Sequence, residues 1–191
     1  MTNPGHDDMA LLLAAAARGE ELAWRELVHR YGKRVFALVK SRCGNLDVAE
    51  EITQSVFATV AAKLGAGEYA ELGRFESWLF RVAMNRLRDY VRQVRRRPVS
   101  SDEGAIEATP TPTPGGGVSQ SELERLRTAM ESLTGADREI VELRHHGGLS
   151  FKQIAEMLGE PMGTLLARHH RALKKLREIL EEQPRVPAGG A

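Results

Sequence analysis

The chain has 191 residues, of which 42% are hydrophobic, 28% charged and 5% aromatic, and its net charge is +1. This composition excludes collagen and a wholly disordered chain, and the length suits one medium domain or, as we expect here, two small ones. No uncharged apolar run approaches the length of a membrane span, the start does not resemble a secretory signal, and the single cysteine cannot form an internal disulfide, so we expect a cytoplasmic protein.

Apolar residues at helical spacing predict four helices in the first half of the chain, over residues 7–17, 20–42, 47–64 and 76–96. Asp47 followed by Glu50 resembles a capping box, which predicts that the third helix begins there. A loop over residues 65–74 precedes the fourth helix. The predicted core face of that helix comprises Leu79, Ala83, Leu87, Tyr90 and Val94.

Residues 98–121 contain four prolines and four glycines without apolar periodicity, which predicts a flexible linker. Beyond it, the pattern predicts helices over residues 120–132, after Thr134, over 151–158 and over 162–182. Thr134 with Asp137, and Ser150 with Gln153, predict helix caps. Strand patterns are absent, so we predict an all-α fold with domains over residues 1–97 and 122–183 and a disordered tail over 184–191.

Basic residues are concentrated in two short segments. Residues 81–97 carry seven arginines against Asp89 alone, and residues 163–178 carry five basic residues against Glu178. The stretch between them, residues 98–136, is acidic. Such local asymmetry predicts contact with phosphate groups, although two solvated helix faces are the alternative.

The helix 151–158, the turn 159–161 and the longer basic helix have the order of a helix-turn-helix, whose second helix enters the major groove. A purely structural hairpin is the alternative. The predicted apolar face of the second helix comprises Leu165, Ala172, Leu173, Leu176, Ile179 and Leu180, and the outward face Ala167, His170, Arg171 and Lys174. Arg171 is the candidate for a base edge, because a guanidinium can donate two hydrogen bonds to guanine; phosphate contacts are predicted for Arg168, Lys174, Lys175 and Arg177.

The histidine pairs 145–146 and 169–170 do not predict a metal site, because adjacent histidines on a helix point in different directions and no further ligand completes the set. His169 lies near the apolar face, where we expect it to pack or hydrogen-bond within the module.

Two aromatic residues lie on the polar sides of their predicted helices. Phe57 shares a side with Glu50 and Gln54, which predicts a docking patch for another protein; packing against a neighbouring helix is the alternative. Trp78 lies among arginines, which predicts stacking on unpaired bases; ordinary packing between helices is equally consistent with the pattern.

The segments 47–57 and 75–97 resemble region 2, and the segment 132–180 resembles region 4, of bacterial sigma-70 family factors of the extracytoplasmic-function (ECF) type. The resemblance implies a sigma factor that binds core RNA polymerase and directs it to promoters in transcription initiation. The implied partners are the β′ clamp helices, the β flap, promoter DNA and a possible anti-sigma factor. No enzyme motif, cofactor or metal is expected, and a stand-alone helix-turn-helix regulator is the alternative.

The resemblance also implies site residues. The surface that docks on polymerase would comprise Asp47, Glu50, Glu51, Gln54 and Phe57. The part that recognises and melts the minus-10 element would include Arg74, Phe75, Trp78, Asn85, Arg88 and Arg92. The part that reads the minus-35 element would include Thr164, Ala167, Arg168, His170, Arg171, Lys174 and Lys175. Leu166 and Ala167 replace a basic residue and a serine that members often carry, so we expect readout to shift to His170 and Arg171.

Overall fold

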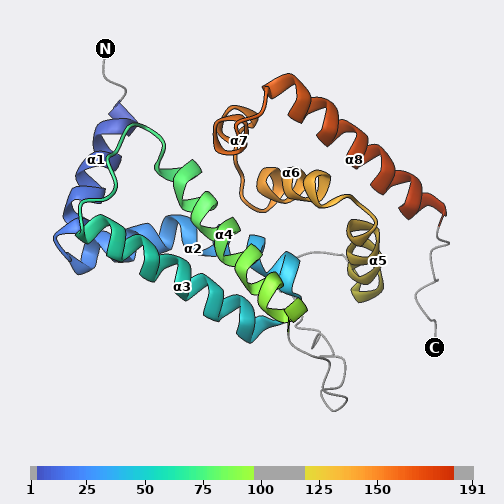
Figure 1. Ribbon diagram of the computed structural model, residues 1–191, viewed down its shortest axis with the longest axis horizontal. Helices are drawn as coiled ribbons and strands as arrows, with labels where there is room; N and C mark the ends of the chain where they lie inside the picture. Colours follow the sequence, from blue (N-terminus) through green and yellow to red (C-terminus); the bar gives the residue numbers. More distant parts are fainter. Residues whose placement is uncertain (1–3, 97–118, 183–191) are drawn as a thin grey trace.

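The computed structural model describes residues 4–96 and 119–182, and every regular element within these ranges is a helix (Figure 1). The predicted tail and most of the predicted linker lie outside the described residues. The described ranges contain no helix long and apolar enough to cross a membrane. The helices are α1 Pro4–Ala17, α2 Glu21–Cys43, α3 Leu46–Gly65, α4 Phe75–Arg96, α5 Gln120–Glu131, α6 Gly135–His145, α7 Phe151–Leu158 and α8 Met162–Glu182.

Helices α1 to α4 pack around an aliphatic core, which takes in Leu27, Val35, Val56 and Leu79. The predicted start of α3 is wrong in one detail. Asn45 caps the helix, because its Oδ1 accepts a hydrogen bond from the Val48 backbone N–H at 3.0 Å. Asp47 lies instead in the first turn, where a carboxylate interacts favourably with the helix dipole.

The core face predicted for α4 is correct for its first three turns and wrong at its end. Leu79, Ala83 and Leu87 are buried and Tyr90 is half-buried, whereas Val94 is 49% exposed.

Helices α5 to α8 form the second group, in which α7, the turn after it and α8 make a helix-turn-helix. The predicted caps are confirmed: the Thr134 hydroxyl accepts from the Asp137 N–H, and Ser150 and Gln153 make a reciprocal capping box. Gly159 ends α7 with a positive φ of 70°, a conformation that glycine adopts without strain.

The apolar face predicted for α8 is only partly correct. Its buried residues are Leu165, Ala172 and Leu176, and Ile179 and Leu180 are partly buried. Leu173 is 39% exposed, because α5 and α6 cover a narrower stripe of α8 than the helical wheel suggests.

The two groups of helices pack directly on each other. One continuous cluster of buried residues joins Leu38, Phe80 and Met84 of the first group to Leu143 and Ile154 of the second. Figure 1 shows α7 beside α4, and α6 beside α2 at the centre of the molecule.

Candidate nucleic-acid interface

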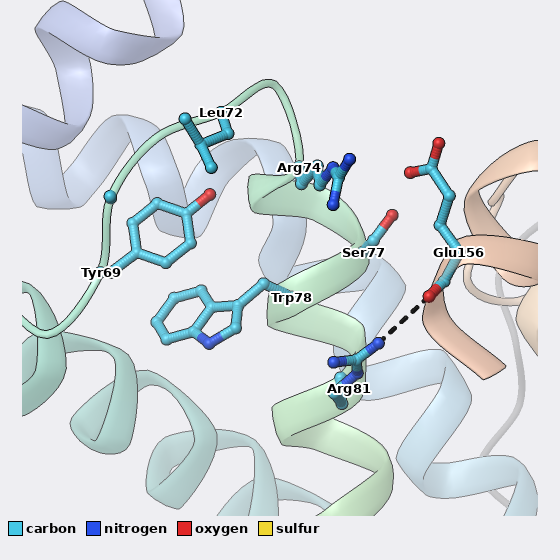
Figure 2. A pocket seen from close by; sticks show the side chains of 8 residues that line it. Tyr69, Leu72, Arg74, Ser77, Trp78, Arg81 and Glu156 are labelled. Carbon is cyan, nitrogen blue, oxygen red and sulfur yellow. Dashed lines mark hydrogen bonds between the residues drawn. The ribbon is translucent and has the colours of Figure 1, made fainter. Parts of the chain in front are cut away.

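A pocket with a volume of about 210 Å³ opens beside the first turns of α4 (Figure 2). The loop before α4, α4 itself and α7 all contribute to its lining, which comprises Tyr69, Ala70, Leu72, Arg74, Ser77, Trp78, Arg81 and Glu156. It thus combines two aromatic rings with two guanidinium groups. This combination suits an unpaired base, whose flat face stacks on an aromatic ring while cations attract the neighbouring phosphates.

The aromatic wall of the pocket depends on Phe75. Its ring centroid lies 5.5 Å from that of Tyr31 and 5.8 Å from those of Tyr69 and Trp78. Phe75 is only 3% exposed, so in this conformation a ligand in the pocket would not reach its ring, and its direct contact with DNA stays a prediction. Phe75 lies beneath the pocket as part of the core and supports the rings that line it.

The structure is consistent with both interpretations of Trp78, packing between helices and stacking on an unpaired base. Its ring lies 4.3 Å from the Tyr69 ring, and the residue also packs against the core. It nevertheless remains half-buried and faces the pocket (Figure 2). The packing therefore fixes the orientation of a ring that is still accessible to a ligand.

Hydrogen bonds order the loop before α4. The Tyr69 hydroxyl donates to Glu71 Oε2 at 2.7 Å, and Glu71 Oε1 accepts from the backbone N–H groups of Gly73 and, at 3.1 Å, Arg74. Burial and the Glu71 contact raise the pKa of the Tyr69 hydroxyl, which keeps it protonated as a donor. The sequence did not single out Tyr69 or Leu72 as pocket residues, because a loop has no periodicity, although an aromatic residue just before a helix with Trp and Arg was an available signal. It also missed Ser77 in α4, because a small polar side chain there carries no signal of a pocket.

The arginines in and just before α4 differ in what surrounds them. Arg74, in the preceding loop, and Arg92 are exposed, and Arg92 lies 3.9 Å from the exposed Asp89. Arg88 forms an ion pair of 2.6 Å with Glu139 of α6, and also donates to Asn85 Oδ1 at 3.1 Å. The predicted minus-10 residues other than Phe75 therefore lie along the exposed side of α4 and the loop before it. Glu139 of the second group of helices engages one of them, Arg88.

The outward face of α8 is exposed as predicted. Thr164, Ala167, His170, Arg171 and Lys174 are all exposed. Arg168, in contrast, is half-buried and engaged by acidic groups, because its guanidinium lies 3.1 Å from Glu160 and 3.9 Å from Asp137. The Lys175 ammonium donates to the Ser132 carbonyl oxygen at 2.6 Å. These two side chains tie α8 to its neighbours, which leaves Arg171 as the planar donor best presented to a groove.

His169 packs within the helix-turn-helix, as expected. Its Nε2 lies 3.1 Å from Nε2 of His145, which joins α8 to α6, and the edge of the ring contacts Phe151. In such a pair one ring nitrogen donates a hydrogen bond and the other accepts it. At least one of the two rings must therefore be a neutral imidazole. Among the residues that the structure describes, no group of three histidine, cysteine or acidic side chains is placed to hold a metal ion.

The histidine pair should make stability depend on pH. Burial, followed by the charges of His145, Arg144 and His170, lowers the pKa of His169 below its usual 6.5. As pH falls through about 6.5 the unfolded state therefore takes up a proton first, and the free energy of unfolding decreases. Urea unfolding between about pH 7.5 and pH 5.5 should show a smaller decrease for His169→Gln than for the wild type. His29→Gln, at an exposed position on α2, should leave the decrease unchanged; a His169→Gln profile identical to wild type would contradict the assignment.

The third candidate surface lies on α3. Asp47, Glu50, Glu51 and Gln54 are exposed, and Phe57 is half-buried and packs against the core. Phe57 therefore fits both of its predicted roles in part: it is fixed by packing inside the molecule and leaves some of its ring on the acidic surface.

The helix-turn-helix, the exposed cationic face of α8 and the aromatic pocket with its arginines define the class of the molecule. It is an all-helical protein of the nucleic-acid-binding class, with one face suited to a duplex groove and another suited to unpaired bases.

Comparison with known proteins identifies the family. Residues 27–97 match the family model for Sigma-70 region 2, and residues 129–178 match that for Sigma-70, region 4. The ECF RNA polymerase sigma factor SigE of Mycolicibacterium smegmatis is 32% identical over 182 residues, which cover 92% of this chain and 69% of that protein. The ECF RNA polymerase sigma-E factor of Escherichia coli K12 is 30% identical over 172 residues, which cover 85% of this chain and 88% of that protein. The chain belongs to the sigma-70 family, as an ECF-type RNA polymerase sigma factor.

Solved structures share the fold. CnrH, in a complex with the cytosolic domain of CnrY, has a TM-score of 0.69 at 24% identity, over 92% of this chain and 98% of that chain. The sigma factor RpoE of Bartonella quintana, in a complex with the anti-sigma factor NepR, has a TM-score of 0.66 at 23% identity, over 84% of this chain and 98% of that chain.

Proposed function

We propose that this sigma factor binds core RNA polymerase, directs it to promoters and opens the DNA near the start site. The observation that carries the proposal is the presence of a region 2 match and a region 4 match on one chain, each with its own exposed cationic face. A stand-alone helix-turn-helix regulator would use α8 but would leave the aromatic pocket of α4 and the acidic surface of α3 without a role.

Each surface has a proposed partner. The α3 surface, made of Asp47, Glu50, Glu51, Gln54 and Phe57, docks on the β′ clamp helices. The pocket beside α4 holds an unpaired base of the minus-10 element, with Trp78 and Tyr69 as stacking platforms and Arg74 beside the backbone. Helix α8 reads the minus-35 element through Arg171 and His170, while the helices around it rest on the β flap.

The chain acts by binding and not by catalysis in this proposal. Unstacking a base costs a few kcal/mol, and capture of the exposed base together with phosphate contacts offsets this cost. Melting therefore requires no nucleotide hydrolysis by the chain. The site of action is the cytoplasm, where core polymerase and promoter DNA are available, and an anti-sigma factor is a possible further partner.

Run-off transcription tests the proposal directly. The purified chain is mixed with core polymerase and a library of promoter fragments, and the transcripts are sequenced. We expect transcripts that start at a restricted set of fragments only when the chain is present. Co-purification of the chain with core polymerase separates this function from that of a polymerase-independent regulator, which would bind DNA but would not be retained by the enzyme.

Charge reversal on α3 should weaken polymerase binding. Glu50→Lys combined with Glu51→Lys removes two exposed carboxylates from the proposed docking surface. Loss of contacts of this kind typically costs about 1–2 kcal/mol, which is roughly a 5–30-fold increase in Kd. Fluorescence anisotropy of labelled chain titrated with core polymerase measures the change. Asp8→Lys, at an exposed position on α1, is the control and should leave Kd unaltered; equal affinity for all three proteins would exclude this surface.

A further inference from the structure

The first two turns of α8 present apolar side chains at the place where a recognition helix contacts bases. In a helix-turn-helix the N-terminal residues of the second helix reach base edges in the major groove. In α8 these turns span residues 162–168, and their exposed side chains are those of Met162, Thr164, Leu166 and Ala167. Leu166 is 43% exposed, whereas the adjacent Leu165 is fully buried. This exposure leaves the Leu166 side chain available for contact with a ligand.

These turns offer few polar side chains for reading a base. Arg168 is the one charged residue in the sequence of residues 162–168, and its guanidinium is engaged by Glu160 at 3.1 Å and lies 3.9 Å from Asp137. Thr164 contributes a single hydroxyl group. Arg171, the planar donor assigned to guanine, lies in the third turn of α8. Readout by a charged side chain therefore begins in the third turn, and the first two turns require another kind of contact.

Leu166 and Ala167 lie on the same side of α8 as the residues assigned to base contacts. Residues four apart on a helix are neighbours one turn apart, which pairs Leu166 with His170 and Ala167 with Arg171. All four side chains are exposed. Helices α5, α6 and α7 pack against α8 from its buried side, and α8 runs along the outside of its group of helices (Figure 1). The apolar pair is therefore continuous with the face assigned to DNA.

We propose that Leu166, with Ala167 beside it, reads the 5-methyl group of a thymine in the minus-35 element. This proposal rests on the function proposed above for α8. The thymine methyl is the apolar group that base pairs present in the major groove, where the other groups are hydrogen-bond donors and acceptors. Its burial against an apolar side chain is favourable in proportion to the area removed from water. Leu166 thus selects an A·T pair beside the guanine read by Arg171.

The helix geometry gives the position of this thymine. Leu166 and Arg171 are five residues apart, which corresponds to about 7.5 Å along an α-helix. Successive base pairs are about 3.4 Å apart. The preferred minus-35 element should therefore contain an A·T pair within about three base pairs of the guanine whose preference Arg171→Ala relaxes. A preferred element without an A·T pair in that range would contradict the proposal.

Removing the methyl group alone tests the contact on the wild-type protein. The fragment is selected from the promoter library by its binding to the chain mixed with core polymerase, and is then synthesised with uracil in place of single thymines. This change keeps every hydrogen-bonding group of the base pair. Anisotropy of the fluorescein-labelled fragment measures Kd. We expect a roughly 3–5-fold increase for uracil at one thymine of the minus-35 element, the effect of losing one buried methyl group, and no change for uracil upstream of the element.

Leu166→Ala should remove this sensitivity to uracil. The variant should bind the thymine fragment roughly 3–5-fold more weakly than wild type and should bind the thymine and uracil fragments with nearly equal affinity. Circular dichroism checks that the variant is folded. Leu173→Ala is the matched control, because it makes the same substitution at a residue that is 39% exposed, two turns further along α8. The control should keep the full sensitivity of the wild type.

The possible results separate this proposal from its competitors. Equal Kd for thymine and uracil at every position of the minus-35 element would overturn it, as would sensitivity that persists in Leu166→Ala. A Leu166→Ala variant that binds core polymerase more weakly and keeps its sensitivity to uracil would place Leu166 against the polymerase. Fragments are selected by binding, so failure of the proposed function in run-off transcription would be seen independently. Failure of base readout by α8 as a whole would leave promoter preference unchanged in Arg171→Ala as well.

Discussion

Glu142→Leu should lower the free energy of unfolding by about 3–5 kcal/mol, because it removes one partner of a buried ion-pair network and leaves the others without a counter-charge. Glu142 is 0% exposed, and the side chains of Arg42 and Arg138 that it receives are each 18% exposed. Arg42 Nη2 is already buried without a hydrogen-bond partner among the described residues, so loss of the carboxylate would leave a guanidinium with little compensation. Urea-induced unfolding followed by circular dichroism measures the effect.

The matched control is Glu181→Leu, which makes the same substitution at an exposed position near the end of α8. Surface substitutions of this kind usually alter stability by less than about 0.5 kcal/mol. A decrease for Glu142→Leu that is no larger than for the control would show that the network does not stabilise the fold.

Arg171→Ala should weaken promoter binding by about 1–3 kcal/mol and relax the preference at one base pair. The reason is geometric: Arg171 is exposed on the outward face of α8, and a guanidinium can donate two hydrogen bonds to one guanine. The measurement is run-off transcription by the holoenzyme on a promoter library, compared position by position between variant and wild type.

Lys174→Ala separates base readout from phosphate contact. Lys174 is exposed one turn further along α8, where its nearest acid is Glu178 at 3.7 Å. Its loss should weaken binding about equally for all sequences and reduce the dependence of affinity on salt. Unchanged promoter preference in Arg171→Ala would refute the assignment of Arg171 to a base edge.

Helix positions were largely predictable because they depend on local signals. Ser150 and Gln153 lie three residues apart, and the structure has the capping box and the helix from Phe151 to Leu158 that this spacing predicts. The outward position of Arg171 followed from the 3.6-residue period in the same way. The error at the start of α3 has a local cause too, since Asn45 and Asp47 are both acceptable caps and only the backbone conformation decides between them.

Burial was less predictable, because a helical wheel shows which residues share a face but not how much of that face is covered. Val94 and Leu173 lie on the apolar faces predicted for their helices, yet both are exposed. Phe75 lies beside Trp78 at the start of α4, yet it points into the core and Trp78 faces the pocket. The helical period separates the two rings, since position 75 lies one turn before Leu79 on the core face and Trp78 lies on the polar side, but a boundary expected at residue 76 left Phe75 outside the predicted helix.

The sequence alone determined the helices, the caps of α6 and α7, the two basic segments and the family, because each depends on residues close together along the chain. Only the tertiary structure placed Tyr69 against Trp78 and Glu142 against Arg42, and only it brought α7 to the pocket. Contacts between residues of different elements, whether nine or 100 positions apart, leave no periodic pattern in the sequence. They depend on how two sets of helices share one buried core, which is decided by the shapes and volumes of their facing side chains.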